Sequence, residues 1–254
     1  MAVRHGSWPD GGTRGRTAGL TAVRRGAEYG TAPGRRYSVA PDATVIEPGR
    51  MKESDHLAES EPKFRIRARH TADTVTVYQA YSPRIGGPAA RHGRFPAEWK
   101  RDRMTWIKPS FLWMMYRCGW GTKEGQETVL AVEITREGFA WVLRHSCLSH
   151  YVPELHGDQA EWKRRLRRSS ARVQWDPERD LHLNPLPHRS LQLGLTGEAA
   201  VRYADEWIVG IEDVTPLARE VHGHVRAGEP DRAAALLPVE RPYPVAEDAL
   251  GHLR

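Results

Sequence analysis

The chain has 254 residues, a formal net charge of +6 and only two cysteines. Two cysteines exclude a disulfide scaffold and a zinc site made of cysteines alone. The longest apolar run, residues 111–116, is far too short to span a bilayer, so the sequence predicts a cytoplasmic protein with no membrane partner.

The first fifty residues differ in composition from the rest of the chain. They contain eight arginines, no lysine and four acidic residues, so they carry +4 of the net +6. They show no helical or strand periodicity, which is typical of disorder. We therefore expect a tail over 1–60, with Met51 as a candidate start, a folded domain over 61–226, and a C-terminal helix and tail over 227–254. An arginine-rich targeting arm is the alternative interpretation of the tail.

The folded part begins with two predicted strands. Residues 63–68 and 74–81 have the composition of strands, and 74–81 is especially rich in β-branched and aromatic residues. Residues 82–93 are rich in glycine and proline, which predicts a loop.

The most distinctive stretch is residues 103–121, with the sequence RMTWIKPSFLWMMYRCGWG. Pro109 suits the first turn of a helix, and Gly119 suits the position just past its end. The residues between them are apolar on every side, which indicates a buried helix.

The remaining elements are predicted by their own local patterns. They are an inner strand at 129–134, a helix at 136–144, a helix at 158–172 opened by Asp158 and Glu161, a strand at 173–175 ended by a turn at Asp176-Pro177, a strand at 191–195, a helix capped by Thr196 that reaches about Trp207, and short helices at 216–224 and 231–237. Strands and helices interleave without a strict βαβ rhythm. We therefore expect an α+β fold: one domain with a mixed or antiparallel sheet, a buried central helix and peripheral helices.

Common sequence fingerprints of cofactor and metal sites are absent. The chain has no G-x-G-x-x-G after a strand, no P-loop and no H-E-x-x-H. His222 and His224 have no third ligand at a sensible spacing, so we expect no metal. Cys118 and Cys147 lack an activating context and are interpreted as small buried residues.

The first candidate site is the start of the predicted buried helix. A helix N-terminus presents unpaired N–H groups and a partial positive charge, so additional cations there favour a bound anion. The alternative is that these cations pair with nearby surface acids. The candidate residues for a phosphate or carboxylate are Arg103, Thr105, Trp106, Lys108 and Ser110.

A second candidate site lies at the other end of the same helix. Arg117 and Trp120 combine a cation with an aromatic ring, which suits a nucleobase through stacking and cation–π contacts. The alternative is a helix C-terminus stabilised by its own basic residues. Glu127, Glu178 and Tyr81 are the candidate catalytic residues, with the two glutamates as acid/base groups. The alternative for Glu178 is a polar residue of an ordinary turn.

The predicted helix at 158–172 is densely basic. Lys163, Arg164, Arg167 and Arg168 would follow a phosphate backbone if the protein bound RNA or DNA. The alternative is a solvated helix face.

Several segments together resemble a known family. They are VYQAY at 77–81, RMTWIKPSFLWMMYR at 103–117, GWG at 119–121 with Gln126 and Glu127, DPER at 176–179 and SLQLGL at 190–195. The sequence resembles the domain-of-unknown-function family DUF4291 of bacteria and fungi over about residues 63–225. The resemblance implies a domain boundary after Met51 but no mechanism, since the family is uncharacterised.

The residues themselves favour an enzyme that binds a phosphorylated, flat-ringed ligand such as a nucleotide or NAD. One concrete version is a transferase with a fold similar to the ADP-ribosyltransferases, a fold that needs no glycine-rich phosphate loop. The alternatives are a non-catalytic RNA- or DNA-binding module that uses the basic helix, and a structural or interaction protein. The sequence leaves the identity of the cofactor and the oligomeric state open.

Overall fold

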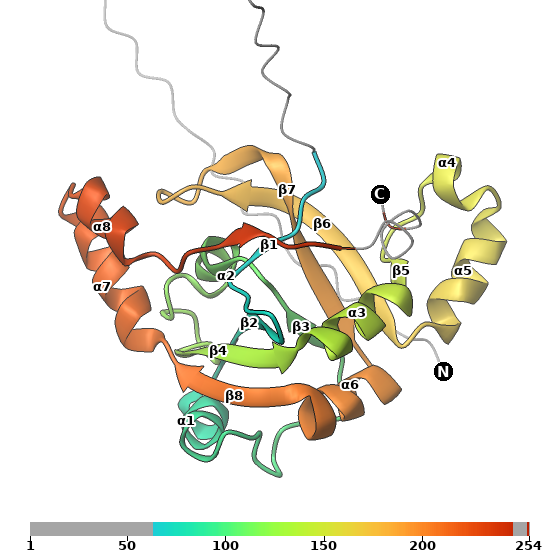
Figure 1. Ribbon diagram of the computed structural model, residues 1–254, viewed down its shortest axis with the longest axis horizontal. Coiled ribbons are helices and arrows are strands. Elements are labelled where there is room, and N and C mark those ends of the chain that lie inside the picture. The colour runs from blue at the N-terminus through green and yellow to red at the C-terminus, as the bar shows by residue number, and fades with distance from the viewer. Residues whose placement is uncertain (1–62, 246–252, 254) are drawn as a thin grey trace, which may run out of the picture. The chain divides into compact units, whose positions relative to one another are not determined.

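The computed structural model describes residues 63–245 and 253 (Figure 1). The predicted tail over 1–60 lies outside the described residues. The strands are β1 (Arg67–Ala68), β2 (Thr74–Tyr81), β3 (Thr105–Ile107), β4 (Thr128–Thr135), β5 (Ser146–Leu148), β6 (Ala171–Arg179), β7 (Pro185–Leu195), β8 (Ile208–Asp213) and β9 (Arg241–Pro242). The helices are α1 (Pro83–His92), α2 (Phe111–Cys118), α3 (Arg136–Arg144), α4 (Pro153–His156), α5 (Gln159–Arg168), α6 (Glu198–Arg202), the π-helix η1 (Tyr203–Trp207), α7 (Thr215–Arg226) and α8 (Pro230–Leu236).

In the described part of the chain the strands form three small sheets. One has the order β2-β4-β8, one has the order β3-β7-β6-β5, and β1 pairs with β9. Among the described strands, every pairing is antiparallel except β5–β6, which is parallel. An isolated bridge between Tyr78 and Lys108 joins the first two sheets edge to edge. The predicted α+β fold with a mixed or antiparallel sheet is confirmed.

The two faces of the β2-β4-β8 sheet are buried against different layers. Successive side chains of a strand point to opposite faces, so Val75 and Val77 share one face while Thr76 and Tyr78 share the other. Val75 and Val77 belong to the main apolar core. Tyr78 belongs to a second apolar cluster that includes residues of α2 and α7. Helix α2 therefore packs on the face that carries Tyr78.

Helix α2 begins and ends where the sequence predicts. The Ser110 hydroxyl accepts a hydrogen bond from the N–H of Trp113, and Gly119 ends the helix in the left-handed conformation at φ 59°. Pro109 lies before the N-cap rather than in the first turn. Most of the helix is buried, as predicted, but Tyr116 is 38% exposed, so one side of the helix is not covered by the described residues.

The predicted loop at 82–93 is wrong, because these residues form α1. Pro83 occupies the first turn and Gly93 ends the helix at φ 64°, so the glycine and proline mark helix ends instead of a loop. A Cβ on Gly86 would lie 2.5 Å from Cβ of Thr128. This glycine lets α1 approach β4 closely.

The predicted turn at Asp176-Pro177 is also wrong. Strand β6 continues to Arg179, and its pairing with β7 shifts register between Pro177 and Arg179. A proline is tolerated in a strand at such an irregularity. The same ladder extends β7 back to Pro185, well before the predicted strand at 191–195.

Two helix predictions need smaller corrections. The helix predicted from Thr196 is α6 followed by η1, and its N-cap is Gly197. Helix α5 ends at Arg168, because Ala171 already begins β6. Its predicted cap is confirmed, since the Asp158 carboxylate accepts from the N–H groups of Ala160 and Glu161.

In the part of the chain that the structure describes, no helix combines the length and the apolar character that crossing a membrane requires.

Candidate functional site

One face of the four-stranded sheet carries polar side chains instead of apolar ones. Trp106 pairs with Gly194, which also pairs with Arg172, and Gln192 pairs with Gln174, so these residues share a face. Lys108 directly follows β3 and is two positions from Trp106, so its side chain lies on the same face of the sheet. We call this surface the polar face; its residues are Trp106, Lys108, Arg172, Gln174, Asp176 and Gln192.

Lys108 is a buried charge on the polar face. It is 6% exposed, and its Nζ makes one long hydrogen bond, 3.4 Å, to the carbonyl of Trp106. No carboxylate of residues 63–245 lies within ion-pair distance of Nζ. Burial, together with the charge of Arg117, lowers the pKa of Lys108 from 10.5 to about 7 against the weaker opposing effect of Asp176.

The other polar side chains of the face are arranged around a single carboxylate. Asp176 accepts hydrogen bonds from Nε2 of Gln192 at 2.6 Å and from Nε2 of Gln174 at 3.0 Å. The Nε of Arg172 is buried and has no partner among the described residues. Trp106 packs over Gly194, where an added Cβ would lie 3.0 Å from the indole ring. The face thus offers cationic donors and an aromatic ring side by side.

The N-terminus of α2 is occupied by carboxyl groups of the protein itself. The Ser110 hydroxyl donates to Oε1 of Glu178 at 2.8 Å, and the N–H of Phe111 donates to Oε1 of Glu240 at 2.7 Å. Burial, and then the charge of Glu178, raise the pKa of Glu240 from 4.5 to about 8. The sequence predicted a ligand's phosphate at this place. Glu240 was missed because it lies far along the chain and reaches α2 only through the β1–β9 pairing.

Tyr81 and Thr105 belong to a buried hydrogen-bond network. Nε2 of Gln79 donates to the hydroxyls of Tyr81 and Thr105 at 2.9 and 2.7 Å, and the Tyr203 hydroxyl donates to Oε1 of Gln79 at 2.7 Å. Nε1 of Trp99 donates to Tyr81 as well. Burial raises the pKa of Tyr81. These contacts give the two hydroxyls a structural role that links β2, β3 and η1.

The remaining predicted residues lie in separate surroundings. Arg103 is exposed. Trp120 is buried and stacks on His222 with ring centroids 5.2 Å apart. Glu127 accepts from the N–H of Gly125 at 2.8 Å, while its Oε2 is buried without a partner among the described residues. Arg117 lies close enough to Lys108 to lower its pKa. The structure therefore groups Trp106, Lys108 and Arg117, and separately groups Ser110 with Glu178.

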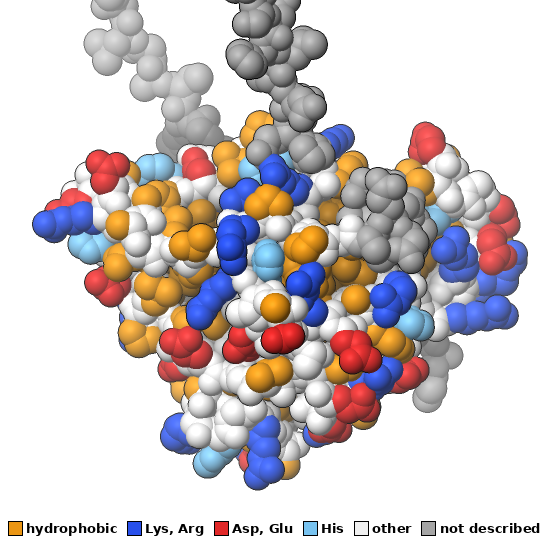
Figure 2. All heavy atoms as spheres, in the orientation of Figure 1, with side chains coloured by type: hydrophobic (Ala, Val, Ile, Leu, Met, Phe, Trp, Pro, Cys, Tyr) orange, Lys and Arg blue, Asp and Glu red, His pale blue; other side chains and the backbone are white. Residues whose placement is uncertain are grey.

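Helix α5 presents its cations to solvent. Lys163, Arg167 and Arg168 are exposed, while Arg164 forms an ion pair with Glu161. Trp162 fixes the helix by donating from Nε1 to the carbonyl of Leu148 at 3.0 Å. Lysine and arginine side chains gather over α5 at the right of Figure 2, with acidic side chains among them.

The residues that could hold a metal do not gather. Within the described ranges, 63–245 and 253, no three His, Cys, Asp or Glu side chains lie together as a metal site. His224 instead contacts Glu229 at 2.6 Å. Cys118 and Cys147 are free and buried, as predicted, and burial raises the pKa of both thiols.

Comparison with protein families gives one finding. The family model for the domain of unknown function DUF4291 matches residues 65–243. This range contains the polar face, α2 and the carboxyl groups at its N-terminus. A search of the curated proteins found no match.

Proposed function

The chain belongs to the DUF4291 family, and we propose that it is an enzyme that binds a phosphorylated, flat-ringed ligand, of the nucleotide or NAD class, on the polar face. The observation that carries this proposal is Lys108, a buried amine with no acidic partner among the described residues. Burying a charge without a partner is costly, so proteins keep such groups mainly where function uses them.

A phosphate group would supply the charge that the polar face lacks. Lys108 and Arg172 both have N–H groups that the described residues leave unsatisfied. Phosphate oxygens accept several charge-assisted hydrogen bonds at once. The indole of Trp106 lies on the same face and would stack against a flat ring. The ligand's phosphate thus binds the cations while its ring contacts Trp106.

The pKa of Lys108 suits proton transfer. An acid/base group works best when its pKa lies near the working pH, and Lys108 has a pKa of about 7. Asp176, held by the amides of Gln192 and Gln174, is the anion that faces this amine. We assign Lys108 as the acid/base group of a transferase. Glu178, which accepts a hydrogen bond from the Ser110 hydroxyl, serves as a second acid/base group.

The proposal predicts ligand-dependent stabilisation. We expect NAD or ATP at millimolar concentration to raise the melting temperature of the wild-type protein, because a ligand that binds only the folded state stabilises it. The rise should vanish in Lys108→Met and persist in Lys100→Met, which removes an exposed lysine. Each variant is compared with its own ligand-free melting temperature. Phosphorus NMR of the same mixtures then follows turnover.

Two results would overturn the proposal. One is the absence of any shift in the wild type with NAD, ATP and related nucleotides. The other is an equal shift in Lys108→Met. Binding without any change in the phosphorus spectrum would support the proposed ligand site but contradict the proposed enzymatic activity.

A second candidate function is RNA or DNA binding through α5, favoured by its exposed cations. Reversing the charges of Lys163, Arg164, Arg167 and Arg168 should then abolish binding and flatten its salt dependence, because each phosphate contact releases counterions. The matched control reverses four other exposed cations: Arg84, Arg91, Arg94 and Lys100. Equal binding by both variants, measured by fluorescence anisotropy against salt, would exclude this function.

A further inference from the structure

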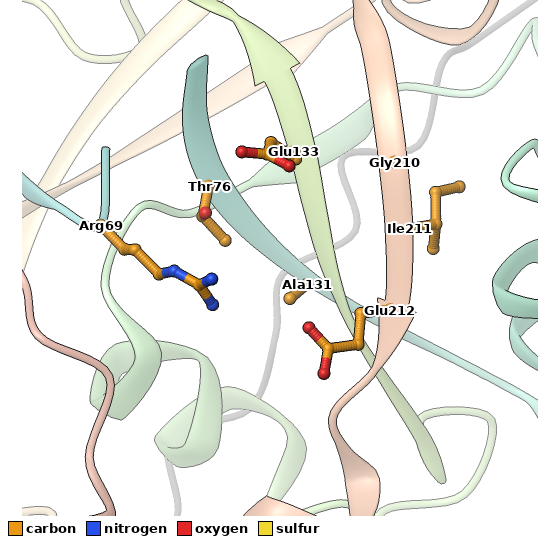
Figure 3. A pocket seen from close by; sticks show the side chains of 7 residues that line it. All are labelled: Arg69, Thr76, Ala131, Glu133, Gly210, Ile211 and Glu212. Carbon is orange, nitrogen blue, oxygen red and sulfur yellow. The ribbon is translucent and has the colours of Figure 1, made fainter. Parts of the chain in front are cut away.

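A pocket of about 210 Å³ lies on the face of the β2-β4-β8 sheet that carries Tyr78 (Figure 3). Its volume is several times the roughly 30 Å³ share of one liquid water molecule and below the roughly 300 Å³ of the smallest drug-sized sites. The pocket therefore fits a ligand about as large as an amino acid. It is separate from the polar face, which lies on the other large sheet.

Small residues open this pocket in the middle of the sheet. Ala131 pairs with Glu212, and Gly210 pairs with Glu133, so the two small residues alternate with two carboxylates on adjacent strands. Arg69 follows β1 and closes the pocket from the opposite side (Figure 3). A Cβ added to Gly210 would meet no atom within 4 Å. The space above this glycine is thus unfilled by the protein.

The charges that line the pocket face one another without pairing. The Arg69 guanidinium and the Glu212 carboxylate point toward each other across Ala131 (Figure 3), yet they form no ion pair within 4 Å. Glu133 accepts a hydrogen bond of 2.5 Å from the Thr74 hydroxyl and lies next to Thr76. One cation and two carboxylates give the pocket a net charge of −1.

We propose that this pocket binds a free amino acid that carries a net positive charge, arginine or lysine. The ligand's α-carboxylate would bind the Arg69 guanidinium, since this pair forms two parallel charge-assisted hydrogen bonds. Its α-ammonium would bind Glu212, and its cationic side chain would balance Glu133. A ligand with both signs of charge bridges the gap that Arg69 and Glu212 leave between them. This proposal does not depend on the function proposed for the polar face.

The test titrates the full-length protein with arginine, lysine, glutamate and arginine methyl ester, followed by calorimetry. We expect arginine or lysine to bind, glutamate to bind more weakly, and the methyl ester to lose affinity because it lacks the carboxylate. Arg69→Met and Glu212→Gln should each weaken binding of the free amino acid roughly tenfold or more. The Arg69→Met variant should bind arginine and arginine methyl ester with equal affinity.

A variant that fills the pocket with a side chain separates loss of binding from loss of folding. Gly210→Leu should abolish binding while preserving the melting temperature, because the open space accepts the side chain. Val209→Leu is the matched control, since Val209 is a 59% exposed neighbour that does not line the pocket. The proposal is overturned if neither arginine nor lysine binds the wild type, or if Gly210→Leu binds as tightly as Val209→Leu does. Neither result bears on nucleotide binding at the polar face.

Discussion

Replacing Lys108 with methionine should make the protein more stable, raising its free energy of unfolding at pH 7 by roughly 3 to 5 kcal/mol. The reason is the change in the pKa of this lysine from 10.5 in the unfolded chain to about 7 in the folded protein. One pKa unit corresponds to about 1.4 kcal/mol of difference between the protonation states. Methionine fills a similar volume and needs no hydrogen bonds, so it avoids this cost.

The sign of the pH dependence follows from proton binding. Between about pH 7 and pH 10.5 the unfolded chain holds a proton on Lys108 that the folded protein largely does not. Stability contributed by this site therefore rises with pH across that range. Below pH 7 both states hold the proton and the full cost applies. Above about pH 10.5 neither state holds it, so the advantage of Lys108→Met should disappear there.

Urea unfolding of the wild type and Lys108→Met at pH 7, 9 and 10.5 measures this difference. Lys100→Met, an exposed site, should match the wild type throughout. Glu240 acts in the opposite direction, because its raised pKa makes stability fall between about pH 4.5 and pH 8. Subtracting the wild-type curve at each pH removes that contribution. A variant less stable than the wild type at pH 7 would show that Lys108 stabilises the fold.

Replacing Gln79 with leucine should destabilise the protein by roughly 2 to 4 kcal/mol. Gln79 is 3% exposed, and its amide serves the hydroxyls of Tyr81, Thr105 and Tyr203. Leucine would leave the Tyr203 hydroxyl, which is fully buried, without its acceptor. A buried polar group that loses its partner costs about 1 to 3 kcal/mol, and this variant affects more than one.

A double-mutant cycle identifies the source of that loss. Tyr203→Phe removes the hydroxyl that Gln79 accepts from, so the double variant should lose less stability than the two single variants summed, by about 1 kcal/mol. Gln159→Leu, at an exposed position on α5, serves as the control and should change stability little. Additive losses, measured by urea unfolding at pH 7, would contradict a coupled network.

Local patterns correctly predicted those elements whose hydrophobic pattern in the sequence matches their burial in the fold. Strand β2 and helix α3 have the predicted bounds, and α2 has its predicted end at Gly119. Helix α1 was missed because its glycines and prolines have the composition of a loop. The close contact of Gly86 with Thr128 explains why one glycine is there. That contact involves a residue distant in sequence, which no local pattern reveals.

The candidate site was predicted in part. Lys108 and Ser110 were grouped because they are neighbours in sequence, but β3 carries Lys108 onto the polar face while Ser110 caps α2. Ser110 donates to Glu178 of β6, and Asp176 of the same strand acts on the pKa of Lys108 through its charge without pairing with it. The pocket at Arg69 had no signal in the sequence, since its charges come from three separate segments.

The sequence by itself determined the α+β class and the family, because composition, local periodicity and an unusual motif are properties of neighbouring residues. Only the tertiary structure decided what each charge faces. Sheet pairing sets Asp176 near Lys108, and the C-terminal strand β9 brings Glu240 to the start of α2. Burial and neighbouring charges depend on such long-range contacts, and they cause the pKa shifts of Lys108 and Glu240.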